Sequence, residues 1–338
     1  MTGRTVVTTA GESIELETAA PWVSALLAES LGGGDAREAS TRSSLRIRVE
    51  EGRRPFASQG WAFLTRDAWV RDHAVLMRDV CTSGFDLLLE WASHDAEFTF
   101  RWNPPLRTRA ANRALRSRFH LLARAALLQY PALWWAGTRG RVPLHAPSFE
   151  RRQRTPLLAG PSGVGKSTLL ARELADGGAC AVSDNLSVGD GERVWGLVEP
   201  MRAERLPGRR MAHGRREGDL PNRVDVLTPD CLVSVRRGEG PGADVRSLDA
   251  EAAARVLVTG TYMAGELRRY WPFAATLAAA TGLGPTHAPV VEVAQSFANR
   301  LPCLEVAIPK AGDLRLSDIL AEAGPTNPGV GPSRAAVQ

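Results

Sequence analysis

The stretch that most constrains this chain is residues 160–168, which spell Gly-Pro-Ser-Gly-Val-Gly-Lys-Ser-Thr. It matches the phosphate-binding loop pattern, in which a glycine and four further residues precede Gly-Lys-Ser or Gly-Lys-Thr. A short apolar run at 155–159 leads into the loop, and residues 169–174 have the apolar spacing of a helix. The sequence therefore predicts a strand, a glycine-rich loop and a helix in succession.

Each residue type in this loop has a physical role toward an anion. Glycine takes positive φ and lets backbone N–H groups approach a phosphate, and the following helix N-terminus favours negative charge. Lys166 can contact the β- and γ-phosphates of a nucleotide, and the Ser167 hydroxyl suits Mg²⁺. A turn that binds nothing would need neither side chain. The predicted nucleotide-binding residues are Gly160, Pro161, Ser162, Gly163, Val164, Gly165, Lys166, Ser167 and Thr168.

Lysine is rare in this chain, which gives Lys166 added weight. Of the 42 lysine and arginine residues, only Lys166 and Lys310 are lysine. A compact ammonium differs from the planar guanidinium of arginine, so a lysine in the loop indicates a site that needs a point charge. A codon bias that left one lysine there by chance is the alternative.

Length and charge limit the kind of protein. A chain of 338 residues can hold two domains or one large one. The net charge of +5 suits an anionic ligand but is not the clustered basic face of a nucleic-acid-binding protein, so we expect no nucleic-acid partner. The cysteines, at 81, 180, 231 and 303, lack metal-ligand spacing. With neither a signal-peptide pattern nor a membrane-span pattern, we expect a cytoplasmic protein without membrane association.

Apolar periodicity divides the chain into four parts. Residues 1–110 predict a smaller α+β domain, with a helix at 21–31 and half-buried strands in a meandering sheet. Residues 111–137 predict a connecting helix. Residues 138–322 should form the catalytic domain, and residues 323–338, rich in Gly, Pro, Ser and Ala, a disordered tail. Within the catalytic domain we predict strands at 157–159, 180–183, 194–197, 231–235 and 303–308, and helices at 167–175, 250–258, 262–280 and 290–298.

Asp184 is the best candidate for a carboxylate near the loop. It ends a short apolar strand 18 residues after Lys166, and a helix followed by a tight turn would return that strand beside the loop. There Asp184 could accept a proton from an attacking hydroxyl or hold the metal. An aspartate that merely caps a turn is the alternative. The distal strand at 231–235 ends in two arginines rather than an acid, which disfavours a transport or motor ATPase.

Two other features belong to the same region. His145 precedes Gly160 by fifteen residues, enough for a hairpin that returns the imidazole to the mouth of the loop, although a lone histidine is more often structural. Between 202 and 223 lie seven arginines, one or two of which could clamp a transferring phosphate. A solvated loop is the alternative for any one of them. They are Arg202, Arg205, Arg209, Arg210, Arg215, Arg216 and Arg223.

The order of histidine, phosphate loop and strand-end acid resembles the HPr kinase/phosphorylase family, whose catalytic domain is similar to that of the nucleotide-dependent phosphoenolpyruvate carboxykinases. The resemblance covers roughly residues 138–200. It implies an α/β fold with an HPr kinase/PEP carboxykinase-like P-loop domain on a mixed sheet. It also matches His145 to the family's active-site histidine, 160–167 to its nucleotide loop, and Asp184 to an acidic pair that serves as proton acceptor and metal-linked carboxylate.

The sequence departs from that family at two positions. Asn185 stands where the family has its second acid; an amide can coordinate a metal but adds no charge. Thr168 stands where the bifunctional enzymes that also remove phosphate usually carry an acid. These departures favour single-function relatives, such as the kinases that phosphorylate lasso-peptide precursors.

The resulting hypothesis is a kinase that uses ATP and Mg²⁺ to phosphorylate a serine-like hydroxyl on a peptide, protein or small molecule. The expected catalytic residues are Asp184, His145 and Lys166, and the expected metal ligands are Ser167, Asp184 and Asn185. The alternative is a nucleotide-binding regulatory or presentation module with little transfer, which Asn185 would favour. The sequence leaves open the acceptor, the choice of ATP over GTP, and whether the protein forms a homo-oligomer.

Overall fold

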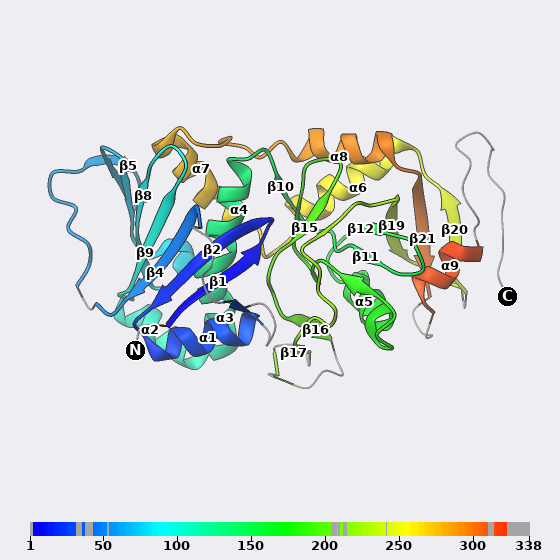
Figure 1. Cartoon of the computed structure of the whole chain (residues 1–338), viewed down its shortest axis with the longest axis horizontal. Coiled ribbons are helices and arrows are strands. Elements are labelled where there is room, and N and C mark those ends of the chain that lie inside the picture. Colours follow the sequence, from blue (N-terminus) through cyan, green and yellow to red (C-terminus); the bar gives the residue numbers. More distant parts are fainter. Residues whose placement is uncertain are drawn as a thin grey trace. The chain divides into compact units, whose positions relative to one another are not determined.

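In a computed structural model the chain is a mixed α/β protein (Figure 1). The structure describes residues 3–31, 36–37, 43–52, 54–203, 208, 210–211, 215–240, 242–309 and 314–322, so the predicted tail lies outside the described residues. The chain divides into two compact units. One takes in most of the chain up to Gly140 together with Arg269–Ala288, and the other holds most of the remainder.

The first unit is built on a nine-stranded mixed sheet with the order β3-β1-β2-β4-β9-β8-β7-β6-β5. Strand β4 pairs parallel to both β2 and β9, and the other pairs are antiparallel. The strands are β1 (Gly3–Thr9), β2 (Glu12–Thr18), β3 (Ala36–Arg37), β4 (Leu45–Glu50), β5 (Ala62–Thr65), β6 (Ala68–Arg71), β7 (Ala74–Met77), β8 (Phe85–Trp91) and β9 (Ala96–Trp102).

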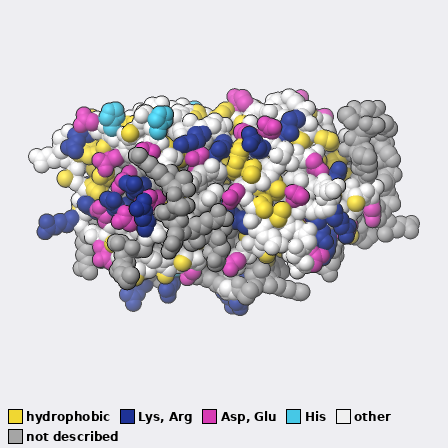
Figure 2. Space-filling view, in the orientation of Figure 1, with side chains coloured by type: hydrophobic (Ala, Val, Ile, Leu, Met, Phe, Trp, Pro, Cys, Tyr) yellow, Lys and Arg dark blue, Asp and Glu magenta, His cyan; other side chains and the backbone are white. Residues whose placement is uncertain are grey.

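One face of this sheet carries mixed charges. On β4, Leu45, Ile47 and Val49 are buried, while Arg46 and Arg48 point away from the core and form ion pairs with acids of neighbouring strands. Figure 2 shows acidic and basic side chains gathered together over these strands. Period-two alternation in the sequence produces this division between an apolar face and a charged face.

The segment predicted as a connecting helix is instead part of the first unit and is interrupted. Leu115, with φ −111° and ψ 58°, separates α2 (Leu106–Ala114) from α3 (Arg116–Arg124). A π-helical turn, Ala125–Gln129, leads into α4 (Tyr130–Gly137), whose residues 130–136 are all buried. Because α4 is apolar on every side, it forms core rather than a solvated linker.

The remaining helices of the first unit complete this core. Helix α1 (Pro21–Leu31) has the predicted bounds, and a short 3₁₀ turn spans Val80–Thr82. Helix α7 (Tyr270–Thr281) comes from within the predicted catalytic domain but belongs to this unit. Its Tyr270 and Phe273 rings pack on Tyr130 of α4, with centroid distances of 5.7 and 5.9 Å.

The second unit has at its centre a four-stranded sheet with the order β12-β19-β21-β20. Strands β12, β19 and β21 are parallel, and β20 is antiparallel to β21. Buried parallel strands have near-continuous apolar runs, as 157–159 shows. The strands are β12 (Pro156–Ala159), β19 (Cys231–Arg237), β20 (Asp244–Ser247) and β21 (Cys303–Ile308), and the helices are α5 (Lys166–Leu174), α6 (Ala250–Tyr262), α8 (Val290–Arg300) and α9 (Leu316–Glu322).

Short strands surround this central sheet. Strands β10, β14, β15 and β18 form an antiparallel sheet, and β11 pairs with β13 and β16 with β17. Their bounds are β10 (Val142–Leu144), β11 (Phe149–Glu150), β13 (Cys180–Ala181), β14 (Ser187–Gly189), β15 (Val194–Gly196), β16 (Met201–Ala203), β17 (Arg216–Gly218) and β18 (Val226–Leu227).

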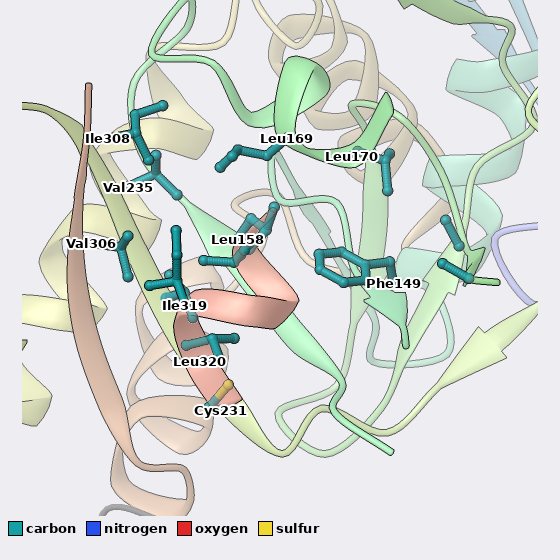
Figure 3. Packing of buried hydrophobic residues seen from close by; sticks show 14 of the residues in the cluster. Phe149, Leu158, Leu169, Leu170, Cys231, Val235, Val306, Ile308, Ile319 and Leu320 are labelled. Carbon is teal, nitrogen blue, oxygen red and sulfur yellow. The ribbon is translucent and has the colours of Figure 1, made fainter. Parts of the chain in front are cut away.

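Helices cover both faces of the central sheet. Helices α5 and α9 pack against one face, where Leu158 meets Leu169 of α5 and Ile319 of α9 in one buried cluster (Figure 3). Helix α6 lies along β12, β19 and β21 on the other side (Figure 1). This arrangement fixes the carboxyl end of β12, where the glycine-rich loop begins.

The predicted helix at 262–280 is wrong in its first part. Helix α6 continues to Tyr262, a turn follows, and α7 begins only at Tyr270. The turn is closed by backbone bonds from Ala264 N to Thr261 O and from Leu267 N to Ala264 O. The predicted strand at 180–183 is also shorter, since β13 ends at Ala181. None of the helices in the described part of the chain is both long and apolar enough to cross a membrane.

Candidate nucleotide site

The glycine-rich loop connects buried strand β12 to helix α5, which begins at Lys166. Gly160 has φ 145° and Gly165 has φ 120°, values that side chains rarely allow. A Cβ atom at Gly160 would lie 2.7 Å from the Val235 carbonyl oxygen, and one at Gly165 would lie 2.9 Å from a methyl of Ile308. Glycine is therefore required at Gly160 for both conformation and space, and at Gly165 for its conformation, because the Ile308 methyl group can move aside.

Lys166 lies over the loop. It is 5% exposed, and its Nζ donates to the carbonyls of Gly160 at 2.7 Å and Pro161 at 3.3 Å. Burial lowers the pKa of the Lys166 ammonium to about 8, although the nearby carboxylates of Glu266 and Asp184 oppose that shift. The Lys166 ammonium is thus held against the loop by backbone carbonyl groups of the loop itself.

Asp184 reaches the first turn of α5. It is 2% exposed, and its Oδ2 accepts from the backbone N–H of Arg202 at 3.0 Å. Burial raises the pKa of the Asp184 carboxyl, while the Arg202 N–H, the Ser167 hydroxyl and the charges of Arg202 and Arg215 lower it. Its Oδ1 is buried and has no hydrogen-bond partner among the residues that the structure describes. One carboxylate oxygen therefore remains for a ligand beside Ser167.

His145 contacts Asn185, the residue that follows Asp184. Its Nε2 is 2.8 Å from Oδ1 of Asn185, and its Nδ1 is 3.1 Å from the carbonyl oxygen of Gly260. A carbonyl can only accept, so Nδ1 carries a proton. Burial and the Lys166 charge lower the pKa of His145, which favours the neutral ring. Nε2 of the neutral ring is then a hydrogen-bond acceptor. A rotation of the Asn185 amide by half a turn exchanges its oxygen and nitrogen, so that Nδ2 donates to Nε2 and Oδ1 is left for a cation.

Helix α6 contacts the loop through a second glycine. A Cβ at Gly260 would lie 2.9 Å from the carbonyl oxygen of Gly160, so only glycine lets the helix backbone approach so closely. The same helix end accepts from His145 through Gly260 O, and Thr261 Oγ1 accepts from the His145 backbone N–H at 3.2 Å. The loop, the histidine and the end of α6 therefore form one packed group.

Glu199 holds the backbone that carries Asp184. Its Oε1 accepts from the N–H groups of Asn185 at 2.8 Å and Leu186 at 2.7 Å. Burial raises the pKa of Glu199 to about 7, although the charge of Arg202 opposes this. Glu199 was not among the site residues predicted from the sequence. The sequence offered one sign of this contact, which is that Glu199 follows a predicted strand and precedes Arg202 by three residues.

Arg202 connects two further acids to the site. Its guanidinium lies 3.4 Å from Glu217 Oε1, across the β16–β17 pair, and 3.3 Å from Glu266 Oε1. Of the arginine-rich stretch, Arg202 and Arg215 are close enough to lower the pKa of Asp184. Three other residues of the stretch, Arg205, Arg209 and His213, lie outside the described residues.

Glu266 was not predicted from the sequence either. It lies in the turn after α6, which the sequence predicted as helix, and is far from the loop along the chain. Its charge nevertheless raises the pKa of both Lys166 and His145. Only the three-dimensional fold brings this carboxylate to the loop.

The donor set fits Mg²⁺ bound together with a nucleotide. Within the described ranges, no group of three or more His, Cys, Asp or Glu side chains is placed to bind a metal. Mg²⁺ usually takes only one or two protein oxygens and completes its octahedron with phosphate oxygens and waters. The Ser167 hydroxyl and the unpaired Oδ1 of Asp184 meet that requirement.

Comparison with known proteins adds no relative, because no protein-family model matches the chain and no curated protein matches it significantly.

Proposed function

We propose that the chain is an ATP-dependent kinase that transfers the γ-phosphate to a hydroxyl group. One observation carries this proposal: the buried carboxylate of Asp184 lies beside Ser167, at the start of the helix whose first residue, Lys166, covers the glycine-rich loop. The unpaired oxygen of Asp184 gives the loop a ligand for the metal ion on which phosphoryl transfer depends.

Each residue of the site has a part in transfer. Bound Mg²⁺·ATP supplies the phosphoryl group and part of its charge neutralisation. Lys166 exchanges its loop carbonyls for phosphate oxygens, and Ser167 and Asp184 face the metal side. The acceptor oxygen loses its proton to a carboxylate and bonds to the γ-phosphorus, while the bond from phosphorus to the bridging oxygen breaks and ADP leaves. His145 orients Asn185 rather than reacting itself.

The resemblance to HPr kinase/phosphorylase supports the same proposal. Its order of histidine, loop and strand-end acid corresponds to groups that lie together in the second unit: His145 contacts Asn185, and Asp184 lies beside Ser167. We therefore assign this unit to the HPr kinase/PEP carboxykinase-like P-loop type. We also place the protein in the cytoplasm, where ATP is abundant, with a hydroxyl-bearing peptide, protein or small molecule as acceptor.

The test is transfer of label from [γ-³²P]ATP. The full chain with Mg²⁺ is incubated with serine-containing peptides encoded next to its gene, and phosphoserine is identified by mass spectrometry. We expect one added phosphate per acceptor, and none with Lys166→Met. If the chain binds nucleotide tightly but neither labels any acceptor nor releases ADP, the result would instead support a nucleotide-binding regulatory or presentation module.

A further inference from the structure

Two carboxylates approach Lys166 from different parts of the chain. Asp184 follows β13, and Glu266 lies in the turn after α6. Arg202 joins them, because its backbone N–H donates to Asp184 at 3.0 Å and its guanidinium to Glu266 Oε1 at 3.3 Å. The charges of both carboxylates act on Lys166, and that of Glu266 acts more strongly. Glu266 is therefore linked through Arg202 to Asp184, and its charge reaches Lys166 of the loop.

The two carboxylates differ in accessibility. Asp184 is 2% exposed, with one oxygen bonded to the backbone and the Ser167 hydroxyl beside it. The Glu266 side chain is 33% exposed. A hydroxyl group on another molecule must reach, from solvent, the carboxylate that takes its proton. Glu266 is exposed enough for that contact, whereas the buried Asp184 is suited to binding the metal ion.

The position of Glu266 is set by packing. Its neighbours Ala264 and Leu267 are 1% and 0% exposed, and the backbone bonds of the turn hold both in place. The turn directly follows the helix end at which Gly260 touches Gly160. The same helix therefore positions the loop and the carboxylate, as a group in direct contact with a reacting atom requires.

We infer that Glu266 is a catalytic residue that faces the acceptor and takes its proton, while Asp184 serves the metal. This inference rests on the proposed kinase function. The hydroxyl proton passes to a Glu266 oxygen as the acceptor oxygen bonds to the γ-phosphorus of the nucleoside triphosphate. The electron pair of the breaking bond leaves on the β-phosphate oxygen, and Glu266 later returns the proton to solvent. The sequence suggested that Asp184 could accept the proton or hold the metal. In this inference Glu266 accepts the proton and Asp184 holds the metal.

A structural role for Glu266 would be to hold Arg202. Glu217 allows this to be tested, because it pairs with the same guanidinium at a similar distance, 3.4 Å, from strand β17. The Glu266 charge raises the pKa of Lys166 and of His145, whereas Glu217 is not among the charges that act on either group. Glu217→Gln thus removes an ion pair of Arg202 but leaves unchanged the carboxylate that we infer faces the phosphate acceptor.

The experiment compares the wild-type full chain with Glu266→Gln and Glu217→Gln. Binding of Mg²⁺ with a fluorescent ATP analogue reports the ground state. Binding of ADP with aluminium fluoride, which imitates the planar phosphoryl group with an attacking water, reports contacts made to the acceptor oxygen. Release of ADP from ATP with water as acceptor reports turnover. Thermal melting checks the fold of each variant.

We expect Glu266→Gln to bind the ATP analogue like wild type, but to bind ADP with aluminium fluoride about tenfold or more weakly. Its turnover should fall about a hundredfold or more, the usual contribution of a positioned base. Glu217→Gln should match wild type in all three measurements. Equal losses in the two variants, or unchanged aluminium fluoride binding in Glu266→Gln, would overturn the inference. A wild-type chain that binds no nucleotide would instead refute the kinase proposal before any variant is compared.

Discussion

The backbone N–H of Arg202 donates to Oδ2 of Asp184 at 3.0 Å, so strand β16 fixes the carboxylate that lies beside the glycine-rich loop. Because this donor is backbone, the contact survives any substitution of the Arg202 side chain except proline. Oδ1 is left as the oxygen that can take a ligand.

Asp184→Asn should separate nucleotide binding from transfer. The amide keeps an oxygen for the Arg202 N–H but loses the charge beside Ser167. We expect transfer to fall about a hundredfold or more, while nucleotide binding without Mg²⁺ stays near wild type. Fluorescent-nucleotide titration with and without Mg²⁺, beside a transfer assay, measures both. Undiminished transfer would remove Asp184 from the mechanism.

Lys166→Met should abolish nucleotide binding and change how stability depends on pH. The pKa of Lys166 is about 8 in the folded chain against 10.5 for the free side chain. Between those values the folded chain binds fewer protons than the unfolded one, so wild-type stability gains roughly 1–3 kcal/mol as pH rises from 8 toward 10.5. The variant should lack this gain. Urea unfolding of both proteins at pH 7.5 and 10 gives the difference, and parallel curves would show that Lys166 is not desolvated.

Glu199→Gln should stabilise the protein at pH 8. The pKa of Glu199 is about 7 when folded and 4.5 when free, so its contribution to stability falls as pH rises from 4.5 to 7. Glutamine keeps an oxygen for the N–H groups of Asn185 and Leu186 and carries no buried charge. We expect a gain of roughly 1–3 kcal/mol at pH 8 and little at pH 4.5. The same change measured at both pH values would contradict the raised pKa.

Glu199→Ala is the matched opposite. It also removes the charge but leaves two buried N–H groups without their acceptor, which costs about 1–3 kcal/mol for each group. Thermal melting should therefore place this variant below wild type at pH 8, with Glu199→Gln above it. If both variants shift in the same direction, the hydrogen bonds to 185 and 186 do not matter.

Gly260→Ala should weaken nucleotide binding from a position outside the loop. Its Cβ would lie 2.9 Å from the Gly160 carbonyl oxygen, so the helix or the loop must move. We expect a stability loss of about 1–3 kcal/mol, typical of overpacking, together with weaker binding of fluorescent ATP. Gly265→Ala, in the adjoining turn, is the control, because nothing lies within 4 Å of its Cβ. Equal behaviour of the two variants would show that α6 does not support the loop.

Local patterns in the sequence sufficed for the elements around the loop. The apolar run before Gly160 forms β12, the helical spacing after it forms α5, and β21 (Cys303–Ile308) has the predicted bounds. Each of these depends on neighbours within a few residues. The predicted helix at 262–280 failed because a turn at Gly265 interrupts an otherwise apolar, alanine-rich stretch that periodicity alone extends across it.

The rest of the site depends on tertiary contacts that no spacing rule contains. Glu199 binds backbone N–H groups at 185 and 186, and Glu266 meets Arg202 across a long separation in sequence. One of the two ring partners of His145 is the main-chain carbonyl of Gly260, which any residue type would supply. Side-chain patterns cannot point to such a partner. The sequence could therefore nominate His145 and Asp184 but not the residues that hold them.

The path of the chain has a practical consequence for dissecting the protein. The first unit depends on Arg269–Ala288, since the rings of Tyr270 and Phe273 lie against Tyr130. A shortened protein that stops at Gly140 would lack those rings and expose part of its own interior to water. Proteolytic fragments that behave as folded bodies should consequently be non-contiguous pieces that remain associated after cleavage, rather than an N-terminal half and a C-terminal half.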